Sequence, residues 1–361
     1  MTLDVLREKT SHDVFIIAEV GKNFIQTEDE RPIAEYLENA KKLAKAAKGA
    51  GADAVKFQTH EVEDEVLNIE FTSPHFKAKD RYAWVTRNTT STPLEEFWKP
   101  LKAYCDDIGV MFFSTPMSRK AAMKLTEVDT PLWKVGSGDA QDYVLLDYLI
   151  ATKKPIIISS GMVSLAELDD VVTYIQGKGE LLAVLYCISQ YPAPAEYFNL
   201  ATIRELREKY PGLSIGFSDH SRGDEVARAA VAAGATIIEK HFSFSRDLWG
   251  ADHKVSMTPE EFAAMVRKIR ANDLVDPAPY LGDKGKELEG AQNQFRPYFN
   301  KALMAGMDIP AGTEIKPEMV FAMRPVSLAG GLPSHEYPNV LGRMARIALK
   351  KYDPITWDVL T

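Results

Sequence analysis

The sequence predicts an α/β protein whose larger part is a closed barrel of parallel strands, followed by a smaller module. Short runs rich in Val, Ile and Phe alternate with segments that carry Ala and Leu at helical spacing, and eight strand runs can be counted. An open doubly wound sheet usually stops at about five or six strands, whereas a (β/α)8 barrel needs eight. No GxGxxG turn follows the first strand. We therefore predict a (β/α)8 barrel.

The expected elements follow one another along the chain with one interruption. Strands are expected at 14–20, 54–57, 110–113, 132–135, 155–158, 182–185, 214–217 and 235–239, each a short apolar run. Helices are expected at 32–50, 94–107, 119–126, 144–151, 165–176, 200–209 and 224–233, where apolar residues recur at three- and four-residue steps. The polar and aromatic segment 61–92 fits neither pattern and is predicted to be a long insertion.

Composition changes after the last repeat and marks a second domain. Residues 272–293 are rich in Asp, Pro, Gly and Glu and are predicted to be a linker after a barrel domain at 1–271. From 294 to 361 the chain consists of short extended pieces separated by Pro and Gly. This pattern favours a compact, loop-rich module at 294–361.

Charge and cysteine content exclude several functional classes. The chain has 43 Lys and Arg against 51 Asp and Glu, a net charge of -8, which argues against general nucleic-acid binding. Two cysteines, Cys105 and Cys187, cannot form a disulfide framework and are expected to be buried thiols in a reducing compartment. The first residues lack an apolar signal core, and no run approaches the length of a membrane span. We expect a cytoplasmic protein that does not bind a membrane.

Polar side chains stand at the end of nearly every expected strand. In a barrel of this kind the active site forms at the carboxyl ends of the strands. The residues found there are Glu19, Lys56, Gln58, Ser114, Thr115, Lys134, Ser137, Asp139, Ser159, Ser160, Ser189, Tyr191, Ser218, His220, Glu239 and His241. Two buried lysines need an anion between them, and the neighbouring hydroxyls favour phosphate. Pairing of the lysines with Glu19 and Asp139 is the alternative, but it accounts for only some of these polar side chains.

Two histidines close the last two strands. Adjacent parallel strands lie about 4.8 Å apart, so His220 and His241 could bind one divalent ion, each at about 2.0 to 2.2 Å. The alternative is two independent loop histidines, each satisfied by its own hydrogen bonds. The density of polar groups at both corners, from Ser218 to Arg222 and from Glu239 to His241, favours a metal or catalytic role.

The strand ends also carry the motifs of a known family. These are IAEVG at 17–21, AVKFQTH at 54–60, STP at 114–116, KVGSGD at 134–139, SSGM at 159–162, CISQYPAP at 187–194, GFSDHS at 216–221, EKHF at 239–242 and GADHKVSM at 250–257. Together they span the barrel in order and resemble the sialic acid synthase family. The resemblance implies an enzyme that condenses phosphoenolpyruvate with an aldose, a C-terminal antifreeze-like (SAF) domain, and a homodimer in which that domain covers the partner's barrel.

The resemblance also implies roles for individual residues. Glu19 is expected to transfer protons, and His220 and His241 to hold Mn2+ or Mg2+, although two imidazoles alone would also admit Zn2+. The positions expected to bind phosphoenolpyruvate are Lys56, Thr115, Lys134, Ser137, Ser159, Ser189 and Ser218. Asp139, Tyr191 and Asp252 match positions that contact the sugar, and Arg324 matches an arginine of the C-terminal domain that does so. The substrate is expected to be an N-acylated aldose such as N-acetylmannosamine, or a diacetamido sugar of the legionaminic and pseudaminic acid series.

Some positions depart from the family pattern. Relatives often carry Asn-His-Asn-Gly after the first strand. This chain has Gly21-Lys22-Asn23-Phe24 there, so any role of that histidine is absent. Asp139 stands where some members have Glu, and Ser189 where some have Asn. The insertion 61–92 is either part of acylamino recognition or a surface or dimer loop. His253 is either a third metal ligand or a hydrogen-bonded loop histidine, and surface or supporting roles are expected for His60, His75 and His335.

Two other functional classes are compatible with parts of the sequence. A related synthase that makes a seven- or eight-carbon acid would need a site for a phosphorylated sugar and would normally lack the C-terminal domain. A non-catalytic carbohydrate- or ice-binding protein is suggested only by that domain. It would not need two lysines, two histidines and Glu19 at one barrel mouth.

Overall fold

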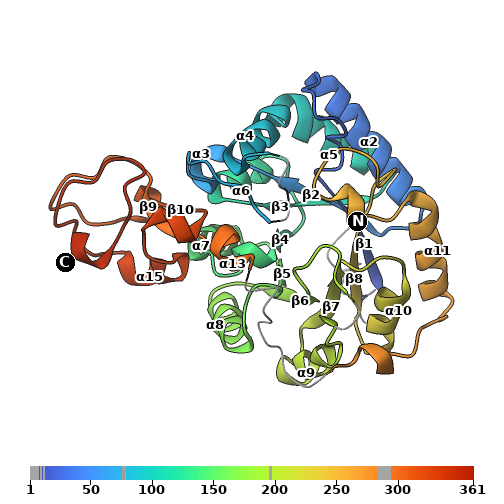
Figure 1. The fold of residues 1–361 in the computed structure, drawn as a ribbon. Helices are drawn as coiled ribbons and strands as arrows, with labels where there is room; N and C mark the ends of the chain where they lie inside the picture. Colours follow the sequence, from blue (N-terminus) through green and yellow to red (C-terminus); the bar gives the residue numbers. More distant parts are fainter. Residues whose placement is uncertain are drawn as a thin grey trace.

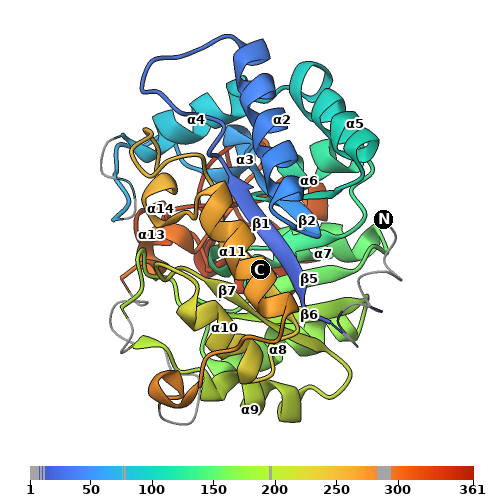
Figure 2. The ribbon, with the colours of Figure 1, turned by 90° about the vertical axis from the view of Figure 1, so that its right-hand side faces the viewer.

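The fold is an eight-stranded parallel barrel with a small β-rich domain beside it (Figures 1 and 2). The computed structural model describes residues 8, 10, 13–74, 76, 79–194, 197–282 and 294–361. The predicted linker 272–293 therefore lies partly outside the described residues. No helix in the described part of the chain is both long enough and apolar enough to cross a membrane.

The barrel strands lie close to where the sequence predicts them. They are β1 (Phe15–Gly21), β2 (Ala54–Thr59), β3 (Met111–Pro116), β4 (Trp133–Val135), β5 (Ile156–Ser159), β6 (Leu181–Cys187), β7 (Ser214–Asp219) and β8 (Ile237–His241). Their hydrogen-bonded order is β3-β2-β1-β8-β7-β6-β5-β4, and β3 also lies against β4. The sheet is thus almost closed, which confirms the barrel.

Helices surround the barrel on the outside (Figure 1). The main ones are α2 (Ile33–Gly49), α5 (Lys99–Ile108), α6 (Arg119–Thr126), α7 (Tyr143–Ala151), α8 (Leu165–Gln176), α9 (Ala201–Lys209), α10 (Glu225–Ala232) and α11 (Pro259–Arg270). A π-helical turn, Leu94–Trp98, leads into α5. No helix was expected after the eighth strand, although Thr258 and Glu261 form a capping box that begins α11.

The strands alternate between two cores, as the two-residue period of a strand requires. In β1, Ile16 and Ala18 pack with the helices, whereas Phe15 and Ile17 belong to a separate apolar cluster inside the barrel. Ile157, Leu185 and other strand residues fill the same interior cluster. The interior is therefore solid at the amino ends of the strands, and only its carboxyl end can hold a ligand.

The insertion at residues 61–92 contains structure that the sequence did not predict. Two helices form there, α3 (Val62–Glu65) and α4 (Arg81–Ser91), and Asp80 caps α4 by accepting a hydrogen bond from the backbone N–H of Ala83 at 2.9 Å. The backbone N–H of Arg324 donates to the Glu65 carbonyl at 2.9 Å. The insertion is thus a contact surface for the C-terminal domain.

The C-terminal domain is compact and rich in loops, as expected. It contains the short helices α13 (Arg296–Phe299), α14 (Val326–Ala329) and α15 (Tyr337–Val340) and the antiparallel pair β9 (Ala302–Ala305) and β10 (Val320–Met323). It lies at one side of the barrel, against α3 and α7 (Figure 1). Arg119 of α6 donates to the Pro317 and Val320 carbonyls at 2.7 and 2.9 Å, which ties the two domains together.

Candidate active site

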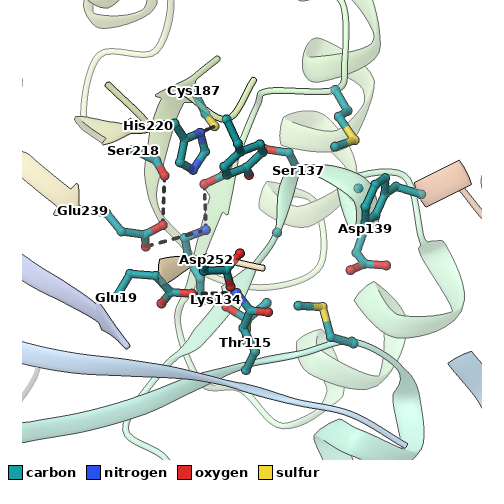
Figure 3. A pocket seen from close by; sticks show the side chains of 18 of the residues that line it. Glu19, Thr115, Lys134, Ser137, Asp139, Cys187, Ser218, His220, Glu239 and Asp252 are labelled. Carbon is teal, nitrogen blue, oxygen red and sulfur yellow. Dashed lines mark hydrogen bonds and ion pairs between the residues drawn. The ribbon is translucent and has the colours of Figure 1, made fainter. Parts of the chain in front are cut away.

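The site is the carboxyl continuation of the inward face of the barrel. Along β1 the inward positions are Phe15, Ile17 and then Glu19, and the register pairs Glu19 with Lys56 of β2 and with His241 of β8. Ser218 of β7 pairs in the same way with Glu239 of β8. Each inward row therefore changes from apolar to polar at the same level, and the polar ends surround one pocket (Figure 3).

Thirteen of the fourteen predicted site residues line this pocket. They are Glu19, Lys56, Thr115, Lys134, Ser137, Asp139, Ser159, Tyr191, Ser218, His220, His241, Asp252 and Arg324. The fourteenth, Ser189, is fully buried next to it, and its hydroxyl has no hydrogen-bond partner in the described part of the chain. A Cβ on Gly161 would stand 2.3 Å from Ser189 Oγ and 2.7 Å from Ser137 Oγ, so this glycine lets both hydroxyls approach.

The two lysines share the centre of the pocket with two carboxylates. Lys56 Nζ lies 2.6 Å from Glu19 Oε2 and 3.7 Å from Glu239 Oε2, and it donates to Thr115 Oγ1 at 3.1 Å. Lys134 Nζ donates to Ser159 Oγ at 2.6 Å and lies 3.9 Å from Glu239. The alternative that Lys56 pairs with Glu19 is thus correct. The second part of that alternative is wrong: Lys134 does not pair with Asp139, which contacts Arg324 and Lys301 instead.

Burial separates the protonation behaviour of the two carboxyl groups. Burial raises the pKa of Glu19, and the nearby Glu239 charge raises it further, although Lys56 opposes both. Burial acts on Glu239 too, but Lys134 and Lys56 outweigh it and bring the pKa of Glu239 to about 2. Burial also lowers the pKa of Lys134. Glu239 therefore stays ionised while Glu19 takes up a proton more readily, which suits Glu19 for proton transfer.

The histidine rings lie as a shared ligand pair would require. Their centroids are 5.3 Å apart, and His220 Nδ1 lies 2.7 Å from the Ile188 carbonyl, to which it can donate so that Nε2 keeps its lone pair. His241 Nδ1 is buried with no hydrogen-bond partner among the described residues, and burial lowers the pKa of His241 to about 3. No group of three or more His, Cys, Asp or Glu forms a metal cage in the described ranges. Burial opposes protonation of His220, but the neighbouring Cys187 and the Ile188 carbonyl outweigh burial and raise the pKa of His220. Once His220 is deprotonated, the two imidazoles fit a divalent ion.

The other half of the pocket is built from ion pairs around Asp139 and Asp252. Asp139 contacts the Arg324 guanidinium and lies 2.9 Å from Lys301 Nζ. Asp252 Oδ2 lies 3.4 Å from Lys22 Nζ. In Figure 3, Asp139 lies to one side of the group formed by Glu19, Lys134 and Glu239. The C-terminal domain thus reaches the pocket of its own barrel through Arg324.

Several lining residues were not predicted as site residues. They are Lys22, Gln58, Arg81, Met117, Gly136, Gly138, Met162, Cys187, Glu239, Phe295 and Phe299. Gln58 and Glu239 were expected at the mouth of the barrel, but without an assigned role. Cys187 also stands at an inward strand end, so the two-residue period could have identified it. Arg81 and the two phenylalanines come from α4 and from the segment before β9, and no strand pattern points to them.

Two other histidines, His253 and His60, are held by hydrogen bonds inside the protein. His253 Nδ1 lies 2.6 Å from Ser243 Oγ and Nε2 lies 3.2 Å from the Ile25 carbonyl, so the hydrogen-bonded alternative is confirmed. His60 is buried, which excludes a surface role, and its Nδ1 lies 2.7 Å from Glu65 Oε2. His335 is exposed. His75 lies outside the described residues.

Comparison with known proteins identifies the family. The NeuB family matches residues 43–276, and the SAF domain matches residues 301–361. The chain belongs to the NeuB family. This confirms the resemblance to sialic acid synthases and the expectation of an enzyme, and the SAF match confirms the antifreeze-like domain.

Named relatives cover nearly the whole chain. N-acetylneuraminate-9-phosphate synthase of Mus musculus is 31% identical over 95% of this chain and 92% of its own length. N,N'-diacetyllegionaminic acid synthase of Legionella pneumophila is 30% identical over 97% and 95%. The solved structure of spore coat polysaccharide biosynthesis protein SpsE from Bacillus subtilis superposes with a TM-score of 0.78 at 29% identity, over 96% of this chain and 95% of that one.

Proposed function

We propose that this protein is a metal-dependent sialic acid (nonulosonic acid) synthase that condenses phosphoenolpyruvate with an N-acylated aldose such as N-acetylmannosamine and releases phosphate. One observation carries the proposal: Lys56 and Lys134 meet a ring of hydroxyls and the pair His220 and His241 in a single pocket. Family membership and relatives that make sugar acids of this class support the same activity.

In the proposed reaction the lysines bind the anionic groups of phosphoenolpyruvate. Lys56 and Lys134 neutralise its phosphate and carboxylate, and hydroxyls donate hydrogen bonds to them. The hydroxyls belong to Thr115, Ser137, Ser159, Ser189 and Ser218. Ser218 donates its one hydroxyl proton to the ionised Glu239 at 3.0 Å, a bond that it would exchange for one to phosphoenolpyruvate.

The acceptor half of the pocket positions the aldehyde. Asp139, Tyr191, Asp252 and Arg324 hold the aldose, and His220 and His241 hold Mn2+ or Mg2+, which would polarise the aldehyde oxygen when bound. A carbon–carbon bond forms between the enol carbon and the aldehyde carbon. Water then adds to the neighbouring cationic carbon, and the bond from that carbon to the phosphate oxygen breaks. Glu19 moves protons between the oxygens on these carbons, because the added water must lose its protons and the former aldehyde oxygen must gain one; the raised pKa of Glu19 favours this role.

The experiment is a panel of aldoses incubated with phosphoenolpyruvate and Mn2+, scored by phosphate release and product mass. We expect turnover of N-acetylmannosamine. Turnover of a 2,4-diacetamido hexose instead would identify a legionaminic or pseudaminic acid synthase, which the similarity to the Legionella pneumophila enzyme favours as the second candidate. If none of these sugars leads to release of phosphate, the proposed function is refuted.

We also propose that the enzyme is a homodimer in which the SAF domain covers the partner's barrel. Specific side-chain contacts join the domain to the barrel. Lys301 Nζ donates to the Met117 carbonyl at 2.6 Å and to Asp142 at 2.7 Å, and Ser334 Oγ donates to the Gln141 carbonyl at 2.9 Å. The same set of contacts would form with a second barrel if the domains were exchanged.

A further inference from the structure

Arg81 enters the pocket from the insertion rather than from a barrel strand. It is the first residue of α4, its backbone N–H donates to the Phe71 carbonyl at 2.8 Å, and the following turn is capped by Asp80. The side chain is only 6% exposed, yet it lines the pocket together with Arg324 and Phe299. Its position is therefore fixed by the backbone of the insertion.

The guanidinium of Arg81 retains donor capacity that the protein does not use. Its Nη2 lies 3.5 Å from Glu65 Oε1, while Glu65 is held more closely by His60 at 2.7 Å. Arg81 Nε is buried and has no hydrogen-bond partner among the described residues. Burial lowers the pKa of Arg81 to about 10 because Glu65 only partly compensates the loss of hydration. A ligand atom that accepted a hydrogen bond here would relieve an unsatisfied donor.

The surroundings of Arg81 place it in the acceptor half of the site. Its guanidinium carbon lies 5.4 Å from the centre of the Phe299 ring, and the Arg324 guanidinium carbon lies 5.9 Å from the same ring. The negative charges of Asp139 and Asp252 both favour the charged form of Arg81. These are the side chains expected to hold the aldose rather than phosphoenolpyruvate. We propose that Arg81 is a specificity-determining residue that donates to an uncharged oxygen of the aldose's acylamino substituent, an inference that rests on the proposed function.

Charge balance favours an uncharged oxygen over a phosphate ester. Lys22 already faces Asp252 at 3.4 Å, Lys301 faces Asp139 and Asp142 at 2.9 and 2.7 Å, and Arg324 contacts Asp139. A dianionic ester would have to displace these carboxylates or lie beside them, at a large electrostatic cost in a buried site. An acyl carbonyl needs only one good donor, which Arg81 Nε can supply.

The test compares Michaelis constants for the two substrates in Arg81→Met and Arg81→Lys. Loss of a charge-assisted hydrogen bond is expected to raise KM for N-acetylmannosamine by about 10- to 100-fold in Arg81→Met, with KM for phosphoenolpyruvate within about twofold. Arg81→Lys keeps the charge but not the Nε donor and should recover only part of the loss. An unchanged KM for the aldose, or an equal rise for both substrates, overturns the proposal.

Arg87→Lys is the matched control on the same helix. Arg87 donates to the Thr27, Glu28 and Asp29 carbonyls and does not line the pocket, so its replacement should lower the melting temperature without changing the ratio of the two KM values. Wild-type enzyme is assayed in parallel with N-acetylmannosamine 6-phosphate. Preference for the phosphorylated sugar that disappears in Arg81→Met would overturn the assignment to an uncharged oxygen.

A binding measurement separates this proposal from the proposed reaction. The alditol obtained by reducing N-acetylmannosamine has no aldehyde and cannot react, so calorimetry with protein, phosphoenolpyruvate and Mn2+ reports binding alone. Binding that weakens about 10-fold or more in Arg81→Met supports the role of Arg81 even if the wild type shows no turnover, in which case only the proposed reaction fails. Binding that is absent from the wild type, or equal in both proteins, refutes the role of Arg81.

Discussion

Single side chains in this protein derive their chemistry from burial together with one or two close partners. Glu19 and Glu239 are the same residue type on adjacent strands, but burial raises the pKa of Glu19 while Lys134 and Lys56 bring that of Glu239 to about 2. His60 and His241 are both neutral because burial brings their pKa values to about 4 and about 3. The environment, rather than residue identity, makes Glu19 easier to protonate than Glu239 and keeps His60 and His241 neutral.

The histidine pair leads to a prediction about metal dependence. Because His220 and His241 are proposed to share one ion, either His→Ala substitution should reduce Mn2+-dependent kcat by about a thousandfold, a loss of several kcal/mol of transition-state stabilisation. Removing metal from the wild type with a chelator should give a similar loss that added Mn2+ reverses. His335→Ala, in the exposed part of the SAF domain, should retain full activity. Retention of metal-dependent turnover by either active-site variant would contradict the shared site.

His60 leads to a prediction about acid stability. In the unfolded chain its pKa is about 6.5, whereas burial lowers the pKa of His60 to about 4 in the folded protein. Between these values His60 is protonated in the unfolded state but not in the folded state, so the stability of the protein falls as the pH drops from about 6.5 to about 4. Between pH 6.5 and 4.5 the free energy of unfolding of the wild type should fall by about 2 to 3 kcal/mol more than that of His60→Gln.

The measurement is urea unfolding of the wild type, His60→Gln and His335→Gln at both pH values. The exposed His335 should leave the pH dependence unchanged, which makes it the control. Parallel pH dependence for the wild type and His60→Gln would show that His60 titrates normally in the folded protein.

At the scale of elements, the barrel strands could be predicted because each one obeys a simple pattern. The eight apolar runs fall within a few residues of β1 to β8, and the strand-end rule found thirteen residues that line the pocket. The errors arise where the chain leaves that pattern. Lys22 follows a break in the register of β1, where Gly21 has a φ of +55°. Arg81 begins a helix of the insertion, which no strand pattern marks.

The loop after β5 (Ile156–Ser159) shows how one backbone position supports the half of the pocket that is proposed to bind phosphoenolpyruvate. Gly161 donates its N–H to Ser137 Oγ at 3.0 Å, and an added Cβ would collide with Ser189 and Ser137 at 2.3 and 2.7 Å. Gly161→Ala should therefore raise KM for phosphoenolpyruvate by about 10- to 100-fold through displaced hydroxyls, with a smaller effect on KM for the aldose. Steady-state kinetics with each substrate varied in turn will measure both.

Gly49→Ala provides the control for this substitution. Gly49 ends α2 (Ile33–Gly49), and a Cβ there would meet no atom within 4 Å. Both KM values should stay the same, and stability should rise by about 0.4 to 1 kcal/mol because alanine restricts the unfolded chain. An equal effect of the two substitutions on KM for phosphoenolpyruvate would show that the crowding at Gly161 is unimportant.

At the scale of the whole molecule, the pocket is complete only when the insertion and the SAF domain meet over the barrel. Leu67 donates its backbone N–H to the Arg324 carbonyl at 3.0 Å, Arg324 donates its own to the Glu65 carbonyl at 2.9 Å, and Lys351 pairs with Glu63 at 2.7 Å. These contacts bring the Arg324 guanidinium to Asp139. In the proposed reaction, holding two substrates together under this cover can contribute about 7 to 11 kcal/mol to the lowering of the barrier at best.

Mixing two inactive variants tests whether that cover comes from the partner subunit. If domains are exchanged in a symmetric dimer, a chain with Glu19→Ala still supplies an intact Arg324 to the barrel of a chain with Arg324→Ala. Random reassembly should then restore about a quarter of the wild-type sites. If each SAF domain serves its own barrel, every chain in the mixture keeps one defect, and no activity above that of the separate variants appears. Phosphate release after joint refolding, with the dimer fraction measured by light scattering, distinguishes these outcomes. A dimeric mixture without recovered activity would show that Arg324 acts on the barrel of its own chain, through the contact with Asp139 that the single chain already contains.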